Sequence, residues 1–499
     1  MFTTGEVIGL LAPLLLFFLF FRTITRCSFS KKPPLPPGPY PWPIIGNIFQ
    51  IGKNAHVQLA EMAKVHGPLM SLRLGQQTLI IGSSSIAASQ ILKTHDHVLS
   101  GRYVSRLLQN KKPTLHNMNL GFASECDDGW RNLRSLYKTE LFSGKALDSS
   151  ANIRENKVIE MVKYLASKEG ESIVIKDVVF VTSMNIIGNA ALSIDLVDFE
   201  GNGVGARIMS SVRKLTMLGA KPILADMYSI LSRWDLQGWY KEVMHIVERE
   251  LGDVWVDSLQ SKRNRSNISS YAKDFTDILI EKGFTNQQIN PVMEELFAAG
   301  TETTSLTIEW FIAELLKNQD VLQKAREEVM KHINGNIVKE SDLVHLPYLE
   351  ACYKEALRLH PIGPLLLPRR AMQTCEIMGY TIPEGSKIFV NVWAINRDPK
   401  IWDDPLSFKP ERFIETNLSY KGNDFGYLPF GSGRRMCIGE AMASKTMLLT
   451  VASLILNFNW FLPNNMNPNE INMDEELEMS LLKKEPLHVI FKLNERSKN

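Results

Sequence analysis

The chain has 499 residues, of which 56 are basic and 54 acidic, so its net charge of +2 is close to zero. Its hydrophobic content of 44% is that of an ordinary globular protein, and the length fits several domains or one large enzyme domain. We therefore expect no nucleic-acid partner, because such partners select for a strongly basic surface.

The cysteines are few, odd in number and widely separated, without any CxxC pair. This pattern argues against a disulfide framework or a zinc site and favours a reducing compartment. They are Cys27, Cys126, Cys352, Cys375 and Cys437.

The first residues differ in kind from the rest of the chain. Residues 7–21 form an unbroken apolar run, and counting back to Phe2 gives roughly the 20 residues that a bilayer span needs. Positive charge follows the run, starting at Arg22, whereas a cleavable signal carries it before the run. We predict a single-pass membrane anchor over 1–24 that leaves the body in the cytosol. The alternative is a buried core helix.

Residues 25–47 are basic and then rich in proline, as in KKPPLPPGPYPWPIIGN. Proline at this density favours extended structure and cannot continue a helix. We predict a stiff hinge here, with a solvated signalling ligand as the alternative, and one catalytic domain over 48–499.

Periodicity along the remaining chain predicts a mainly α fold with small β-sheets. A hairpin is expected over 69–82, and strands are expected within 376–393. The segments with helical periodicity are 56–66, 84–93, 154–167, 240–262, 290–316, 319–332, 346–359 and 438–457.

The segment PFGSGRRMCIGE, residues 429–440, places Cys437 directly before a long apolar helix. Exposed backbone N–H groups and the helix dipole stabilise a thiolate at such a position. Neighbouring glycines permit the close approach of a large flat ligand, and arginines would neutralise its acidic groups. A haem has both properties, and cysteine thiolate is a known axial ligand of haem iron. A structural cysteine in a glycine turn is the alternative.

A second unusual segment is AAGTETTS, residues 298–305, in the middle of a predicted helix. Gly300 costs about 1 kcal/mol relative to alanine there, so some other interaction must offset it. Gly300 would open a notch beside the helix, and an acid followed by a hydroxyl can relay protons to a bound ligand. A solvated acid and an ordinary helix-face threonine are the alternative.

Taken together, these segments resemble the cytochrome P450 family of haem-thiolate monooxygenases. The cysteine segment matches Phe-x-x-Gly-x-Arg-x-Cys-x-Gly at all five fixed positions, and AAGTETTS resembles the oxygen-binding groove of the family. The chain also contains, in the family's order, the motifs Trp-x-x-x-Arg, Glu-x-x-Arg and Pro-Glu-Arg-Phe. The matching cysteine-segment residues are Phe430, Gly433, Arg435, Cys437 and Gly439.

The resemblance implies the cytochrome P450 fold, with haem b between a long central helix and the cysteine segment. Cys437 would be the axial ligand of the iron, and Glu302 and Thr303 would deliver protons during the activation of dioxygen. The remaining matches imply haem-propionate ligands at Trp130, Arg134, Arg435 and Arg369, and a buried structural triad of Glu355, Arg358 and Arg412.

The resemblance also implies partners and a location. Electrons would come from NADPH through NADPH-cytochrome P450 reductase and would be used to activate O2 for reaction with a small lipophilic substrate. The reaction would take place at the endoplasmic reticulum membrane. One departure is visible before Trp130: many plant members read Pro-Tyr-Gly-Pro-x-Trp-Arg where this chain reads ECDDGWR, residues 125–131. The loop before Trp130 is therefore hard to infer by analogy.

The sequence is similar to those of two groups of plant enzymes. One group hydroxylates, couples or rearranges alkaloids of the benzylisoquinoline or tropane type, such as littorine. The other group hydroxylates monoterpenoids. Family analogy places the pocket walls at 101–125, 203–223, 292–303, 362–367 and 474–482. The acidic start of the last segment would attract a protonated amine, or is simply solvated.

Two rival functions remain at this stage. A reductase-independent member that rearranges hydroperoxides would need no proton relay, so Glu302 and Thr303 count against it. A non-catalytic haem carrier or gas sensor would explain Cys437 but not the groove, the anchor or the pocket.

Overall fold

The computed structural model describes residues 33–105, 118–200, 204–231, 234–252, 259–263, 273–416 and 418–498. The predicted anchor over 1–24 lies outside these residues and stays a prediction. Of the hinge, residues 33–41 contain no helix and no strand, and their prolines do not favour a helix.

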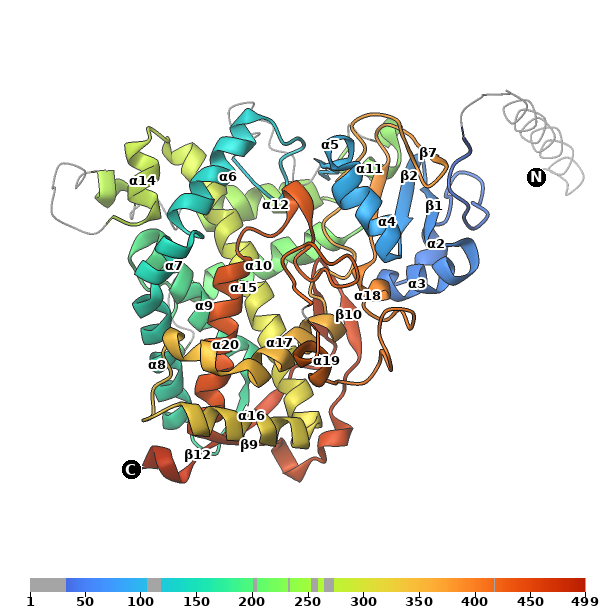
Figure 1. Ribbon diagram of the computed structural model, residues 1–499. Coiled ribbons are helices and arrows are strands. Elements are labelled where there is room, and N and C mark those ends of the chain that lie inside the picture. Colours follow the sequence, from blue (N-terminus) through green and yellow to red (C-terminus); the bar gives the residue numbers. More distant parts are fainter. Residues whose placement is uncertain are drawn as a thin grey trace, which may run out of the picture.

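The fold is organised around one long helix, α15 (Asn286–Lys317), which runs through the middle of the molecule (Figure 1). It starts at a capping box, in which the Thr285 hydroxyl accepts from the Gln288 backbone N–H and the Gln288 side chain accepts in return from the Thr285 N–H. Two further buried helices, α9 (Ile175–Leu192) and α20 (Glu440–Asn457), lie near it in the centre. The central layer therefore consists of helices that are apolar on nearly every side.

Among the described residues, one helix is long and apolar enough to cross a membrane, and it is α9. Its apolar window is 78% buried inside the fold, and it packs against α8, α14 and α15. We therefore interpret α9 as a core helix.

The other α-helices surround these three. They are α2 (Ile48–Ile51), α3 (Ala55–His66), α4 (Ser85–Ser89), α5 (Asp96–Leu99), α6 (Asp128–Glu140), α7 (Gly144–Ser149), α8 (Ala151–Ser167), α10 (Val204–Ala220), α11 (Leu224–Met227), α12 (Trp239–His245), α14 (Phe275–Glu281), α16 (Gln319–His332), α17 (Pro347–Leu359), α18 (Val392–Ile395) and α19 (Glu411–Ile414). Short π or 3-10 turns are η1 (Gln90–Thr94), η3 (Ser229–Leu231), η4 (Ile246–Leu251), η5 (Glu340–His345), η6 (Gly433–Arg435), η7 (Pro463–Asn465), η8 (Pro468–Glu470) and η9 (Glu495–Lys498).

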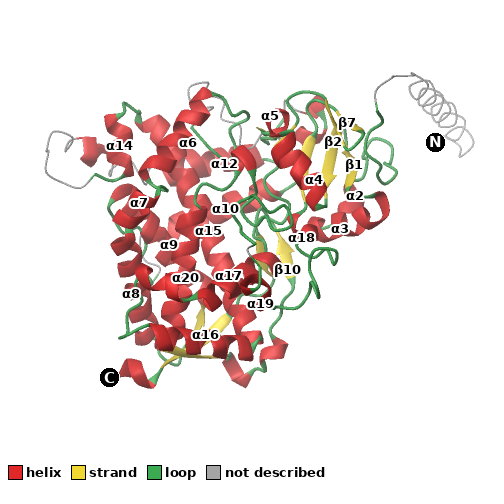
Figure 2. Ribbon diagram, in the orientation of Figure 1, coloured by secondary structure: helices red, strands yellow, loops and turns green. Residues whose placement is uncertain are grey.

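The strands form small sheets beside the helices (Figure 2). The predicted hairpin is confirmed: β1 pairs antiparallel with β2, with Leu69 opposite Gly82 and Leu74 opposite Gln77. A five-stranded sheet has the order β1-β2-β8-β5-β3, and the other sheets are β4-β12-β9, β10-β11 and β6-β7. The strands are β1 (Leu69–Leu74), β2 (Gln77–Gly82), β3 (Gly101–Arg102), β4 (Ser172–Val174), β5 (Arg369–Arg370), β6 (Cys375–Ile377), β7 (Tyr380–Ile382), β8 (Lys387–Val390), β9 (Phe458–Phe461), β10 (Glu475–Leu477), β11 (Leu481–Lys483) and β12 (His488–Leu493).

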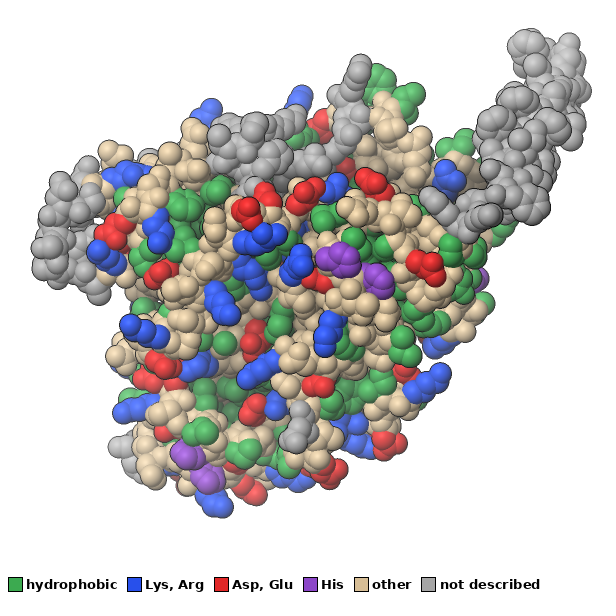
Figure 3. Space-filling view, turned by 45° about the horizontal axis from the view of Figure 1, so that its top comes forward, with side chains coloured by type: hydrophobic (Ala, Val, Ile, Leu, Met, Phe, Trp, Pro, Cys, Tyr) green, Lys and Arg blue, Asp and Glu red, His purple; other side chains and the backbone are tan. Residues whose placement is uncertain are grey.

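Each segment with helical periodicity corresponds to helix in the described residues, although the segment 240–262 divides into α12, η4 and a short helical stretch up to Arg263. On the face turned forward in Figure 3, basic and acidic side chains are interspersed, as the near-zero net charge leads one to expect. The expected fold class, mainly α with small sheets, is confirmed.

Candidate active site

The cysteine segment forms a tight loop that ends at α20. The backbone N–H of Cys437 donates to the carbonyl of Phe430 at 3.0 Å, which closes the loop, and Gly439 is the N-cap of α20. Cys437 therefore lies just before the helix N-terminus, as the sequence predicts, and its side chain keeps accessible surface.

One glycine of this loop, Gly433, is required by the backbone. Gly433 has a φ of +74°, and a Cβ there would lie 2.3 Å from the carbonyl oxygen of Leu92. A side chain at 433 would thus strain the backbone and collide with η1. This corrects the expectation that Gly433 makes room for the porphyrin, because the space it clears belongs to the protein.

The expected stabilisation of the Cys437 thiolate by the helix is only partly present. Burial raises the pKa of the Cys437 thiol, and the N–H groups of Gly439 and Glu440 lower it without reversing the shift. Coordination to a metal cation would deprotonate the thiol outright. The N–H groups at the start of α20 therefore lower the pKa of the thiol, as the sequence predicts, but burial outweighs them.

Arg435 and Trp130 meet beside this loop. The Arg435 guanidinium donates to the carbonyls of Ser100, Leu120 and Ala123 at 2.7–3.0 Å, and the Trp130 indole N–H donates to Leu120 at 3.0 Å. The guanidinium carbon lies 4.8 Å from the Trp130 ring centroid. These two predicted haem ligands are therefore held together and buried.

Arg134 follows Trp130 by one turn of α6 and donates to the carbonyl of Met436 at 2.7 Å. It joins α6 to the cysteine loop directly beside Cys437. Arg369 is buried on β5, where it pairs with Asp96 at 2.8 Å and donates to the carbonyl of Ser432 at 3.1 Å. Both predicted ligands thus contact the same loop from different elements.

The sequence reasoning missed a fourth arginine, Arg102 on β3. It is buried and donates to the carbonyls of Gly121 and Leu367. Burial lowers its pKa well below the ordinary value, and the cations of Arg435 and Arg369 lower it further. No motif flanks Arg102 in the sequence, so only the fold reveals that it belongs to this group.

Whether a haem fits can be judged from these guanidinium groups. Three of them are buried, Arg102, Arg369 and Arg435, and Arg134 lies beside them. Mutual repulsion among buried cations is relieved by an anionic ligand, and the carboxylates of a haem are such a ligand. A porphyrin also supplies its own nitrogen ligands, so it needs only the accessible sulfur of Cys437 from this face. The residues present therefore fit a haem.

Thr303 lies on the face of α15 that also carries Ala299. Thr303 is partly exposed and Ala299 is exposed, although the helix passes through the core. The Thr303 hydroxyl donates to the carbonyl of Ala299 at 2.6 Å. Glu302 is buried next to it.

Gly300 does create a notch, but α9 fills it. A Cβ on Gly300 would lie 2.5 Å from Cδ1 of Ile187. The glycine thus allows α9 and α15 to approach closely, which corrects the expectation that the notch serves a ligand. The close packing of these helices is the interaction that offsets the poor helix propensity of Gly300.

The structure brings the predicted triad together. Both carboxylate oxygens of Glu355 accept from Arg358, at 2.7 and 2.8 Å, and one accepts from Arg412 at 3.0 Å. Glu355 and Arg358 are fully buried, and Arg358 also donates to the carbonyls of Asn396 and Pro405. The triad therefore fastens the irregular segment 396–412 to α17.

One acid of the segment 474–482, Glu475, is engaged in protein contacts. Glu475 accepts from Trp393 and lies 3.0 Å from His56 and 3.4 Å from Arg397. Burial alone would raise its pKa, but hydrogen bonds from His360 and His56 and the charge of Arg397 hold the pKa well below its usual range. Glu475 is therefore not available to attract an amine.

A carboxylate on α15 fastens the loop that precedes α6. Glu295 accepts from the backbone N–H groups of Leu120 and Gly121. Burial raises its pKa to about 7, against the lowering effect of these bonds and of Arg435 and Arg102. Glu295 thereby positions the loop carbonyls to which Arg435 donates.

Comparison with known proteins agrees with this geometry. The family model for cytochrome P450 matches residues 36–491. A probable (S)-N-methylcoclaurine 3'-hydroxylase isozyme 2 from Coptis japonica is 46% identical, over 98% of this chain and 99% of that protein. A corytuberine synthase from Coptis japonica is 42% identical (90% and 92%), and an iridoid oxidase from Catharanthus roseus is 37% identical (96% and 95%).

The chain belongs to the cytochrome P450 family. Within that family it is a monooxygenase similar to plant enzymes, including relatives named as N-methylcoclaurine 3'-hydroxylases and as corytuberine synthase. The family implies a haem, a redox partner, O2 and a substrate.

Proposed function

We propose that this chain oxidises a benzylisoquinoline-type alkaloid at the cytosolic face of the endoplasmic reticulum, with electrons from NADPH through NADPH-cytochrome P450 reductase. The substrate class is supported by the similarity of this chain to relatives whose names refer to such a substrate. Relatives named as N-methylcoclaurine hydroxylases are 42–46% identical over at least nine-tenths of the chain, whereas the iridoid oxidase is 37% identical. A monoterpenoid hydroxylase is the second candidate, which that relative supports.

The residues of the site have distinct tasks in this proposal. Haem, bound through Cys437, would supply the activation of O2. The guanidinium groups of Arg102, Arg369 and Arg435 would bind its carboxylates and fix its orientation. Thr303 Oγ1, on the accessible face of α15, would pass a proton toward the reacting face, with Glu302 as the source.

An apolar surface supports the membrane location. Side chains that are 59–76% exposed include Trp42, Ile44, Ile230, Trp234 and Leu236. The two chain segments that carry them are linked, since the Tyr228 hydroxyl donates to the carbonyl of Ile44 at 3.5 Å. Exposed apolar patches of this kind mark contact with lipid or protein. The patch adjoins the hinge that would lead to the anchor.

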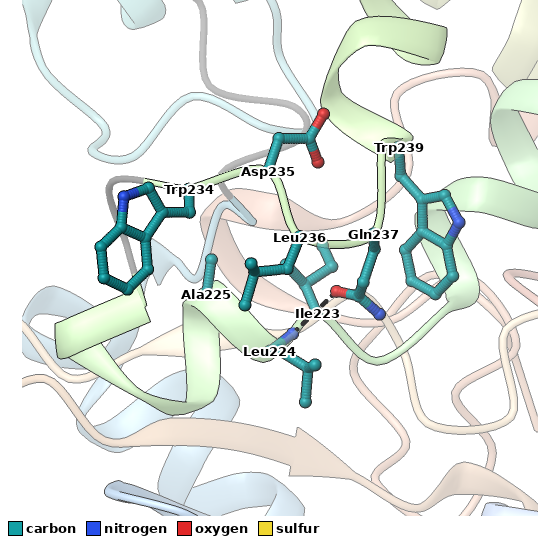
Figure 4. A pocket seen from close by; sticks show the side chains of 8 residues that line it. All are labelled: Ile223, Leu224, Ala225, Trp234, Asp235, Leu236, Gln237 and Trp239. Atoms are coloured by element: carbon teal, nitrogen blue, oxygen red, sulfur yellow. Dashed lines mark hydrogen bonds between the residues drawn. The ribbon is translucent and has the colours of Figure 1, made fainter.

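A small pocket lies beside the same patch (Figure 4). Trp234 and Trp239 flank it, and the side chain of Gln237 accepts from the backbone N–H of Leu224 at 3.0 Å. The lining residues come from 223–239 alone, so the pocket is separate from the cysteine loop. We interpret it as part of the lipid-facing surface.

The test uses membranes that contain the full chain and its reductase. We expect (S)-N-methylcoclaurine to shift the haem from low to high spin and to give an NADPH-dependent product one oxygen heavier or oxidatively coupled. Monoterpenoid alcohols serve as the comparison set. Turnover of the monoterpenoids alone would replace the proposal with the second candidate.

A further inference from the structure

The helix α15, which runs through the middle of the molecule (Figure 1), contacts the loop 119–123 through the side chain of Glu295. One carboxylate oxygen accepts from the backbone N–H of Leu120, and the other accepts from the N–H of Gly121. A carboxylate only accepts hydrogen bonds, whereas an amide would turn its own NH2 group toward one of these donors. Glu295 is therefore matched to two adjacent backbone N–H groups.

The contact also requires a small residue on the loop side. A Cβ on Gly121 would lie 2.8 Å from Oε1 of Glu295, which is too close for these two atoms. Glycine at position 121 thus lets the backbone N–H reach the carboxylate. The two residues are 174 positions apart in the sequence, so their contact forms only in the complete fold.

The carbonyls of the same loop accept hydrogen bonds from the residues that would bind the haem carboxylates. The carbonyl of Leu120 accepts from Arg435 at 2.8 Å and from the Trp130 indole at 3.0 Å. The carbonyl of Gly121 accepts from Arg102 at 2.8 Å. The loop backbone therefore joins α15 to the buried guanidinium groups.

One peptide group connects the two sides of the loop. The carbonyl of Leu120 and the N–H of Gly121 belong to the same planar unit, so neither can rotate without the other. Because Glu295 fixes the direction of this N–H, it also fixes the direction of the carbonyl to which Arg435 donates. Hydrogen bonds in such a chain polarise one another, so an anion at one end strengthens the bond to the cation at the other.

The negative charge of Glu295 also acts directly on its neighbours. Burial lowers the pKa of Arg102 and of Arg435, and the charge of Glu295 opposes that lowering. From α6, Tyr137 faces the same carboxylate: burial raises the pKa of its phenol, and the charge of Glu295 raises it further. Removal of this charge would leave the buried cations with one counter-charge fewer.

We propose that Glu295 is a positioning residue for the haem. Through the Leu120–Gly121 peptide it holds Arg435 and Arg102 in the geometry that binds the haem carboxylates, and its charge lowers the reduction potential of the iron. The inference concerns the cofactor and does not depend on which substrate the protein oxidises.

The test uses the purified full-length holoenzyme in lipid nanodiscs, without substrate. We expect Glu295→Gln to release haem to an excess of apomyoglobin roughly tenfold faster, because one backbone N–H loses its acceptor. The reduction potential, measured by dye-equilibrated titration, should become more positive because a negative charge near the haem is lost.

Two further variants separate position from charge. Gly121→Ala keeps the charge of Glu295 but blocks the contact, so it should also release haem faster while shifting the potential less than Glu295→Gln does. Glu295→Asp keeps both acceptor oxygens and the charge, and it should restore the wild-type potential. Slow haem release in Gly121→Ala would contradict the positioning role.

The pH dependence of the potential gives an independent measurement. Burial raises the pKa of Glu295 to about 7, so the side chain gains its charge as the pH rises through that value. The wild-type potential should therefore fall from about pH 6 to about pH 8 more steeply than that of Glu295→Gln. Equal slopes would refute the effect of the charge.

Glu294→Gln is the matched control, because it removes the neighbouring acid of α15 and leaves both hydrogen bonds of Glu295 in place. The pKa of Glu294 is raised by burial and not by the cations, so this variant should keep the wild-type haem release and potential. Equal changes in Glu294→Gln and Glu295→Gln would overturn the inference. If Glu295→Gln does not retain haem, Gly121→Ala and Glu295→Asp decide by the same two measurements.

Discussion

At the residue scale, the cation group beside the cysteine loop shows how the fold assembles a haem site from distant positions. Arg102, Arg369 and Arg435 come from two strands and a 3-10 turn, and each donates to backbone carbonyls that fix its direction. Sequence motifs identify the latter two but not Arg102. Its role follows from its place among the others.

Replacing Arg102 with Gln should reduce haem retention by roughly tenfold, because charge-assisted hydrogen bonds to an anion contribute more than neutral ones. The measurement is haem content per protein and the carbon monoxide difference spectrum after purification. Arg370→Gln is the control, since Arg370 pairs with Glu125 and is 35% exposed. Equal haem content in both variants would remove Arg102 from the site.

Thr303→Ala should uncouple NADPH oxidation from product formation, because the accessible hydroxyl that would pass the proton is gone. We expect the product formed per NADPH to fall roughly tenfold or more and hydrogen peroxide to be released in its place. Thr304→Ala is the control, since its hydroxyl donates to the carbonyl of Gly300 and its side chain is buried, unlike that of Thr303. Unchanged coupling in Thr303→Ala would contradict the relay.

At the element scale, the segments predicted as helix do not include α9. Its sequence, IKDVVFVTSMNIIGNAAL, has no polar face because the helix is buried on nearly every side. Periodicity carries no signal in that case. For the same reason the partner of Gly300 could not be predicted, since Ile187 lies on that helix.

Gly300→Val should destabilise the protein by about 1–3 kcal/mol, since the new side chain overlaps Ile187. Thermal loss of the haem-thiolate spectrum measures the change. The double variant with Ile187→Ala should recover part of the loss, because the two sites are in contact. Additive losses would show that Gly300 does not serve the packing of α9 against α15.

At the scale of the whole molecule, long-range polar contacts join parts that the sequence presents separately. The sequence predicts the cysteine loop, the groove and the triad because each is a short motif. It does not predict that Glu475 lies between His56, Trp393 and Arg397, which are up to 419 residues away. Contacts of this separation depend on the complete fold, so a local pattern carries no trace of them.

Glu475→Gln should therefore destabilise the entire domain, by about 3–5 kcal/mol at pH 7, because it leaves the buried guanidinium of Arg397 without this counter-charge. The pKa of Glu475 lies below its unfolded value, so its stabilisation is fully present above about pH 4.5 and declines as the pH falls further. The wild-type protein should thus lose stability in acid faster than the variant. Urea unfolding between pH 7 and pH 4 measures both curves, with Glu476→Gln as an exposed neighbour for comparison. Parallel curves would mean that the Glu475 network does not hold the β10–β11 hairpin to the rest of the molecule.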